Sequence, residues 1–136
     1  MTTAGYSGTP LPRKLGLKPG MRVAWLGAPA HFPDLVGPLP DGVRLRTRAA
    51  RPLDLAVLFV TRRGELARRL PGLRDVIAPA GAVWAAWPKR ASGVETDVTE
   101  DVVRDVALPL GLVDVKVCAI DETWSGLRLV IRKELR

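Results

Sequence analysis

A lysine and a serine–glycine pair have the clearest chemical potential in this sequence, because they follow a continuous apolar run. Residues 82–87 are apolar throughout, and Lys89, Ser92 and Gly93 come shortly after them. Such a run predicts a buried strand, and open α/β sheets place their ligands beyond the carboxyl ends of their parallel strands. An ammonium, a hydroxyl and a free glycine amide there could hold an anionic ligand. An ordinary surface turn is the alternative interpretation of Ser92 and Gly93.

The only histidine of the chain lies in a loop after another predicted strand. His31 closes the segment that begins at Gly27, and the residues before Gly27 predict the first strand. An imidazole in that position could act in catalysis or bind a ligand. Neither a serine nor the single cysteine, Cys118, is spaced to His31 as in a known nucleophile signature. We therefore favour a helix-start role for His31, and we expect Cys118 to be a small buried side chain within a strand.

Asp121 and Trp124 lie in a polar segment, residues 121–126, that predicts a hairpin turn between two apolar strands. A carboxylate could transfer a proton there, and an indole could stack on a planar ligand or cover an edge of the core. For Asp121 we favour a structural role, either bonding within its own turn or pairing with a base such as Lys89. For Trp124 we favour the covering role.

All of these residues converge if the chain folds as a largely parallel α/β sheet. Four loops, residues 27–31, 61–63, 88–93 and 121–125, would then meet at the edge formed by the carboxyl ends of the parallel strands, which we call the carboxyl rim. A ligand cleft is expected at such an edge. The predicted ligand-binding residues are Lys89, Ser92, Gly93, Asp121, Trp124, Gly27 and His31.

The composition is that of a globular domain. The chain has 136 residues, of which 47% are hydrophobic and 26% charged. We interpret residues 1–136 as a single domain in which residues 1–20 form an N-terminal arm, with Tyr6, and a short helix. No apolar run is long enough to span a bilayer, and the first residues lack the pattern of a signal peptide. The sequence therefore predicts a cytoplasmic protein without a membrane partner.

The inventory of side chains argues against a metal or disulfide site. One cysteine excludes an intramolecular disulfide, and one histidine without a visible carboxylate cluster argues against zinc. The net charge of +7 comes with 21 basic residues, of which 16 are arginine. Because these are spread along the whole chain, we attribute them first to the composition of a GC-rich genome and only second to a phosphate-bearing partner.

Residues 43–48 alternate between apolar or small and basic side chains and predict a strand. Arg44, Arg46 and Arg48 share one face, so the strand belongs at an edge of the sheet, where charge discourages pairing with other chains. The same row could track the phosphate backbone of a nucleic acid, although it lacks interleaved aromatic residues. The connection to the next strand is too short for a usual crossover helix, which leaves the placement of residues 43–48 in the sheet open.

The remaining pattern predicts a three-layer α/β domain with a mixed sheet of about six strands and a C-terminal antiparallel hairpin. Further strands are expected at residues 54–60, 113–120 and 127–132. The expected helices are 9–16, capped by Thr9; 31–36; 63–77, kinked or broken at Pro71; and one capped by Asp97 that ends near residue 110. On the helix at 63–77 we expect Arg68, Arg69 and Arg74 to face water.

This order of elements resembles the class I methyltransferase-like Rossmann fold. Residues 77–83 look like the proline–glycine turn before the fifth strand of that fold, and the closing hairpin looks like its reversed final pair. The resemblance implies that the strands lie in the order second, first, third, fourth, sixth, fifth. A likeness in fold does not by itself imply an activity.

Three segments are similar to an uncharacterised bacterial family of small proteins, a domain of unknown function. They are residues 5–11, residues 87–93 and residues 121–128. This resemblance spans nearly the whole chain and implies a shared fold, but it brings no activity with it.

The methyltransferase resemblance implies adenosylmethionine, held by a glycine-rich loop after the first strand and an acid after the second. Here Gly27 is the one glycine of that loop, Pro29 lacks an amide donor, and Arg48 stands where the acid is expected. These departures disfavour adenosylmethionine and leave the ligand unknown. We therefore predict a Rossmann-like protein that binds a small anionic ligand or a protein partner at the carboxyl rim. The alternatives are a methyltransferase with a degenerate cofactor loop and a nucleic-acid-binding protein that uses the arginine strand.

Overall fold

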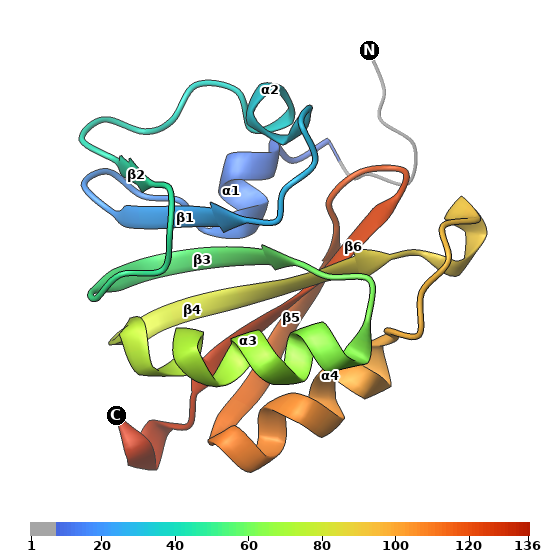
Figure 1. The fold of residues 1–136 in the computed structure, drawn as a ribbon. Helices are drawn as coiled ribbons and strands as arrows, with labels where there is room; N and C mark the ends of the chain where they lie inside the picture. Colours follow the sequence, from blue (N-terminus) through green and yellow to red (C-terminus); the bar gives the residue numbers. More distant parts are fainter. Residues whose placement is uncertain (1–7) are drawn as a thin grey trace.

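The computed structural model describes residues 8–136, so most of the predicted arm, including Tyr6, lies outside the described residues. At its centre is a six-stranded sheet in the order β2-β1-β3-β4-β6-β5 (Figure 1). The strands are β1 (Arg22–Leu26), β2 (Arg44–Arg46), β3 (Leu53–Phe59), β4 (Ile77–Pro88), β5 (Leu112–Ala119) and β6 (Trp124–Ile131). From β2 to β4 neighbouring strands are parallel, whereas β6 is antiparallel to both β4 and β5. The predicted strand order and the C-terminal hairpin are therefore confirmed.

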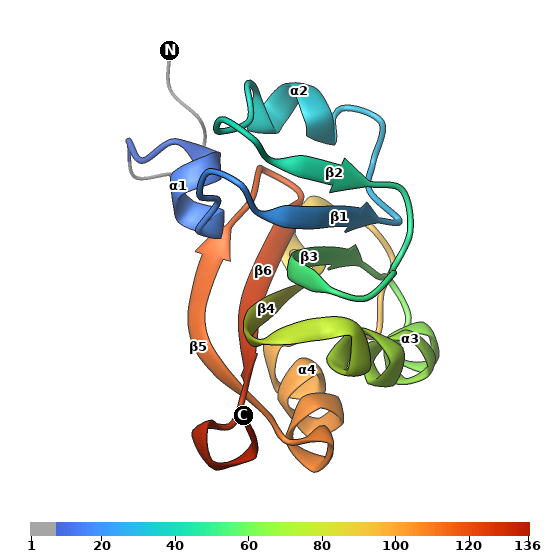
Figure 2. The same cartoon turned by 90° about the vertical axis from the view of Figure 1, so that its left-hand side faces the viewer.

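Helices cover both faces of the sheet and complete three layers, which can be followed in Figure 2. They are α1 (Leu11–Leu15), α2 (Phe32–Val36), α3 (Arg63–Val76) and α4 (Glu100–Ala107), with short 3-10 helices η1 (Arg90–Ser92), η2 (Leu108–Leu110) and η3 (Lys133–Leu135). On one face α3 and α4 pack over a cluster of buried apolar side chains, and on the other face α1 and α2 pack over a second cluster.

The two central strands are buried on both faces, as their uninterrupted apolar sequences predict. Residues 55–60 and 81–88 are all buried. The largest of these side chains, Trp84, is fully buried, and its indole Nε1 donates a hydrogen bond to the carbonyl of Leu15 at 3.0 Å. This bond fixes the end of α1 against the middle of the sheet and satisfies a polar atom that burial would otherwise penalise.

The arginine strand lies at the edge of the sheet, but it is shorter than the sequence predicts. β2 pairs only with β1, and its register runs from Arg44 opposite Arg22 to Arg46 opposite Ala24. Residues 47 and 48 already bend away, so Arg48 lies outside the strand. Because β2 spans only the first half of β1, the chain has a short distance to return to the start of β3. An extended connection therefore suffices where a full strand would need a crossover helix.

Of the kink or break that we expected at the proline of the third helix, the break is absent. α3 runs without interruption from Arg63 to Val76 and includes Pro71. Pro71 lacks the N–H that would bond to the carbonyl of Ala67. Ala67 lies on the exposed side of α3. Leu70 and Leu73, on either side of the proline, remain buried. Packing of this face against the sheet therefore outweighs the local cost of the proline.

Two predicted helix caps are wrong. The N-cap of α1 is Pro10 rather than Thr9, and no side chain caps this helix. α4 is capped by Thr99, whose hydroxyl accepts the amide hydrogen of Val102 at 3.2 Å. The carboxylate of Asp97 accepts instead the amide hydrogen of Arg63 at 2.7 Å, at the start of α3. Asp97 therefore joins two elements that are neighbours in space and not in sequence.

An ion pair at the amino end of the central strands predicts an acid-sensitive contribution to stability. The carboxylate of Asp54 accepts the guanidinium Nε of Arg22 at 3.0 Å and its backbone amide at 2.8 Å. Chiefly through the side-chain bond, Arg22 lowers the pKa of Asp54 below its ordinary value. A group of this kind stabilises the fold above an unfolded-state pKa of about 3.9 and loses the effect as pH falls through the folded-state pKa.

We expect Asp54→Asn to be less stable than the parent protein near pH 7, with a difference that shrinks toward about pH 2. Urea denaturation at a series of pH values measures this. Asp41→Asn, at an exposed turn, is the matched control and should leave the profile unchanged. A deficit of Asp54→Asn that is constant over the whole range would contradict the role of the carboxylate.

Candidate functional site

Hydrogen bonds join three of the four loops that the sequence predicts at the carboxyl rim, whereas residues 61–63 bond to residues 95–97. The turn between β5 and β6, residues 120–123, is the meeting point. The amide of Lys89, after β4, donates to the carbonyl of Thr123 at 2.7 Å. The Nε2 atom of His31, after β1, lies 2.9 Å from Oδ2 of Asp121. Two loops that are far apart in the sequence therefore share one hairpin turn.

Asp121 is the central residue of this arrangement. Its Oδ1 accepts the amide hydrogens of Thr123 and Trp124 at 2.8 and 2.7 Å, and its Oδ2 faces His31. The bonds within its own turn match one of the two structural roles we expected, while the basic partner is His31 and not Lys89. The side chain of Asp121 is 14% exposed, whereas that of His31 is 58% exposed. A carboxylate fixed by backbone amides therefore orients an imidazole that faces solvent.

The helix-start role expected for His31 is confirmed, because it is the N-cap residue of α2. Its carbonyl accepts the amide hydrogen of Leu35 at 3.0 Å, and the next residue, Phe32, is fully buried. The buried ring of Phe32 fixes the position of the helix, and the helix fixes the backbone of His31. The imidazole is thus held from two sides, by α2 and by Asp121.

A row of edge-to-face aromatic contacts runs beneath the carboxyl rim. The ring centroids of Trp124 and Phe59 are 5.1 Å apart, those of Phe59 and Phe32 are 4.9 Å apart, and those of Phe32 and Trp25 are 5.2 Å apart. Trp124 is the first residue of β6 and is half-buried. Its edge-on contact with Phe59 is the covering role that the sequence favours.

Gly27 is held in a conformation that only glycine adopts without strain. Its φ is +68°, and a Cβ atom built on it would lie 2.9 Å from the carbonyl oxygen of Phe59. A guanidinium nitrogen of Arg69, on α3, lies 3.9 Å from the same point. We expected Arg69 to face water, but it is half-buried, because its long side chain reaches up the helix to the rim. Helical spacing alone did not reveal this contact.

Ser92 and Gly93 form an ordinary turn. The Ser92 hydroxyl donates to the carbonyl of Lys89 at 2.6 Å and accepts the amide hydrogen of Val94 at 3.2 Å. Gly93, with φ of +77°, ends η1. The turn interpretation therefore accounts for both residues, while Lys89 is half-buried, and none of the ion pairs found within residues 8–136 involves it.

Cys118, on β5, is half-buried, less than the fully buried position that we expected. Burial raises the pKa of its thiol, and the nearby charges of Lys14, Lys116 and Lys89 only partly offset this. The thiol is therefore protonated at neutral pH and is a weak nucleophile there. This agrees with the interpretation of Cys118 as a small packing residue.

The arginine row at the opposite edge of the sheet is less regular than the alternation suggests. Arg44 and Arg48 are exposed, but Arg46 is partly covered, and its Nε is buried without a hydrogen-bond partner within residues 8–136. Leu45, on the face of the strand opposite the arginines, is 47% exposed. A role of these arginines toward nucleic acid stays a prediction.

Known structures share this fold. A SAM-dependent methyltransferase from Aquifex aeolicus is 18% identical, has a TM-score of 0.65, and covers 89% of this chain and 88% of its own. A fibrillarin pre-rRNA processing protein from Methanococcus jannaschii is 13% identical, with a TM-score of 0.62, over 94% of this chain and 71% of its own. Magnesium protoporphyrin IX methyltransferase from Synechocystis, with bound SAH, is 10% identical, with a TM-score of 0.58, over 83% of this chain and 74% of its own.

At these identities the likeness shows the fold, which is a methyltransferase-like Rossmann fold. No model of a known protein family and no curated protein sequence matches the chain. Membership of the bacterial family named above therefore stays a prediction. Function has to be argued from the residues at the carboxyl rim.

The residues of this chain do not fit the usual mode of binding adenosylmethionine. Gly27 is the only glycine of the loop after β1, Pro29 offers no amide, and the amide of Phe32 is already bonded to the carbonyl of Pro29 at 3.0 Å. After β2, residues 46–50 contain no carboxylate to accept the ribose hydroxyls.

Within residues 8–136, no three His, Cys, Asp or Glu side chains gather closely enough to hold a metal ion. In the same residues, no helix combines the length and the apolar character that crossing a membrane requires.

Proposed function

We propose that this protein binds a small anionic ligand at its carboxyl rim, with Lys89 and His31 as the cationic contacts. The observation that carries the proposal is the placement of both residues against one hairpin turn. Lys89 is bonded to the turn through its backbone amide, and the exposed imidazole of His31 is oriented by Asp121. An exposed ring held by a largely buried carboxylate is an arrangement suited to presenting a fixed donor.

The chemistry of the two contacts differs. The Lys89 ammonium carries three donors on a flexible stem. The His31 ring, with Nε2 next to Asp121, can present Nδ1 to a ligand oxygen, and it adds a second positive charge when protonated. The accessible part of Trp124 is a flat apolar surface beside the turn. These groups favour a ligand that combines an anionic group with a planar portion.

Adenosine monophosphate is a suitable probe, because it has a phosphate and a planar ring, and adenosine is its neutral counterpart. We expect saturable binding of the nucleotide in isothermal titration calorimetry and weaker binding of adenosine. Lys89→Ala should weaken nucleotide binding about five- to tenfold, roughly 1 kcal/mol for one charge-assisted contact, without lowering the melting temperature. Lys18→Ala, an exposed lysine in the turn before β1, should leave the affinity unchanged.

Equal affinities of Lys89→Ala and Lys18→Ala for the nucleotide would overturn the role of Lys89. Native mass spectrometry of freshly purified protein provides an independent measurement, because a ligand retained from the cell appears as a discrete added mass. Loss of that mass in Lys89→Ala or His31→Ala is the expected result.

A second candidate function, an adenosylmethionine-dependent methyltransferase, is supported by the fold of the structural neighbours. Calorimetric titration with adenosylmethionine and with adenosylhomocysteine separates it from the first. Binding of either compound that is stronger than binding of adenosine monophosphate would favour the methyltransferase and a mode of cofactor binding unlike the usual one.

A further inference from the structure

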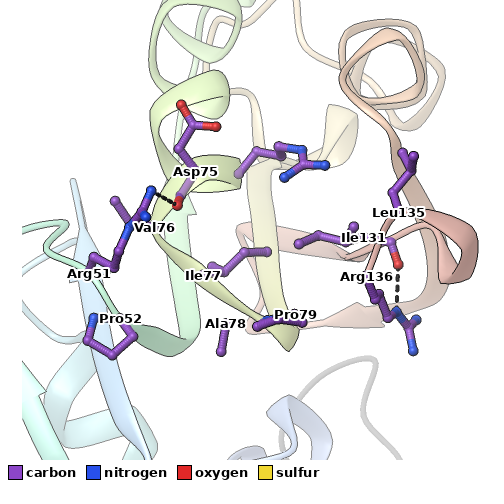
Figure 3. Close-up of a pocket in the computed structure, with 11 residues that line it drawn as sticks. Arg51, Pro52, Asp75, Val76, Ile77, Ala78, Pro79, Ile131, Leu135 and Arg136 are labelled. Atoms are coloured by element: carbon purple, nitrogen blue, oxygen red, sulfur yellow. Dashed lines mark hydrogen bonds between the residues drawn. The ribbon is translucent and has the colours of Figure 1, made fainter.

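Figure 3 shows the residues that line a cavity of about 320 Å³. The cavity lies at the amino end of the parallel strands, opposite the end that forms the carboxyl rim. It is formed where the end of α3 meets the start of β4, between the segment before β3 and the end of β6. Much of its lining is apolar and includes Ile77, Pro79, Ile131 and Leu135. The volume lies at the lower end of the range of small-molecule sites, roughly 300–1,000 Å³, so the cavity suits a small ligand.

Three arginines from three different segments line this cavity: Arg51, Arg74 and Arg136. Each donates one N–H to a backbone carbonyl, at 2.8, 3.0 and 2.8 Å respectively. These bonds fix the guanidinium groups but use only a fraction of their donors, since a guanidinium has five N–H groups. None of the ion pairs found within residues 8–136 involves these three side chains. The cavity thus presents oriented, uncompensated positive charge.

The only acid among the lining residues is Asp75. Its backbone carbonyl accepts the bond from Arg51, and its carboxylate points away from Ile77 and Pro79 (Figure 3). The three arginine side chains outnumber the one aspartate, so the lining favours an anionic ligand. A phosphate monoester has about −1.5 to −2 charges near pH 7. The planar forks of guanidinium groups also match the oxygens of a phosphate.

We propose that this cavity binds a phosphate monoester with a small apolar body. The arginines supply donors for the phosphate, and the apolar lining covers the organic part of the ligand. Sequence reasoning missed this site, because it placed Arg74 in water, whereas Arg74 is half-buried at the end of α3. The proposal is independent of the ligand at the carboxyl rim, and it involves none of the same residues.

The test is a titration of the ¹⁵N-labelled full chain, followed by two-dimensional NMR, with three probes: phenyl phosphate, inorganic phosphate and phenol. Phenyl phosphate is expected to shift the amide signals of residues 75–78 and 131 with saturation, and to bind at least fivefold more tightly than inorganic phosphate. Phenol, which lacks the charge, should cause no saturable shift. Absence of saturable shifts at these residues up to about 10 mM, weaker than roughly 3 kcal/mol of binding, would overturn the proposal.

Arg51→Gln and Arg74→Gln should each weaken phenyl phosphate binding at least fivefold. Arg68→Gln is the matched control, since Arg68 is an exposed arginine on the same helix and does not line the cavity. An unchanged spectrum outside the cavity confirms that each variant is folded. If Arg74→Gln unfolds through loss of its bond to η2, Arg51→Gln still decides the question. Equal weakening by Arg68→Gln would mean a nonspecific effect of net charge. Shifts confined to residues 27–31 and 89–93 would assign the phosphate to the carboxyl rim. Either result overturns the proposal.

Discussion

Replacing Gly27 by alanine is expected to lower the free energy of unfolding by about 2–4 kcal/mol. Two separate effects add up at this position. The φ of +68° is costly for any residue with a Cβ, by about 1–2 kcal/mol. The new methyl group would also lie 2.9 Å from the carbonyl oxygen of Phe59. That oxygen belongs to the buried strand β3 and cannot move aside without disturbing the centre of the sheet.

Urea denaturation followed by tryptophan fluorescence measures the loss. Gly93→Ala is the matched control, because Gly93 has φ of +77° but open space around its Cβ position. It should cost only about 1 kcal/mol, the conformational part alone. If the two variants lose equal stability, the contact with Phe59 has no energetic consequence, and the close approach of the β1 loop to β3 is not a constraint.

Asp121→Ala is expected to cost about 2 kcal/mol of stability and to release the imidazole of His31. The substitution leaves the amides of Thr123 and Trp124 without their acceptor, in a turn that is only partly exposed. It also removes the oxygen that lies 2.9 Å from His31. Chemical denaturation measures the first effect, and the NMR chemical shifts of the His31 ring protons at one fixed pH measure the second.

Two variants separate the contributions of the two oxygens of Asp121. Asp121→Asn retains an oxygen for the turn amides, and it should lose less than about 1 kcal/mol. His31→Ala removes only the exposed partner, and a pair of this kind is worth about 0–1 kcal/mol. A loss in His31→Ala as large as that in Asp121→Ala would show that the pair with His31, and not the turn, is what Asp121 contributes.

Local patterns in the sequence were sufficient to predict the central strands and the closing hairpin. The apolar runs of β3 and β4 predict central strands. A strand that is buried on both faces has apolar residues at consecutive positions and not at every second one. The polar turn between residues 120 and 126 predicts the closing hairpin. Such signals are readable because the side chains involved are neighbours along the chain, and the rise and period of a strand determine which face each occupies. The strand order followed from the resemblance in the order of elements, and the structure agrees with it.

The sequence predicts the ends of the helices and strands less accurately. Pro71 and the segment 77–81 both suggest a break, yet α3 is continuous and β4 begins at Ile77. In each case tertiary packing outweighs local propensity, since the apolar side chains around Pro71 are buried against the sheet. The length of β2 likewise depends on where the chain must return to begin β3, which no residue within β2 reveals.

The loops that form the carboxyl rim were predictable from the sequence alone, because parallel strands must end on the same side of their sheet. The partners within that rim were not. His31 and Asp121 are separated by 90 residues. At the opposite end of the sheet, Arg51 likewise reaches the carbonyl of a residue 24 positions away. Contacts of this kind depend on how the loops close in three dimensions, which leaves no periodic signal. The sequence by itself therefore determined the fold and which loops lie at the carboxyl rim, while only the tertiary structure decided which side chains meet there and that an arginine-lined cavity lies at the opposite end of the sheet.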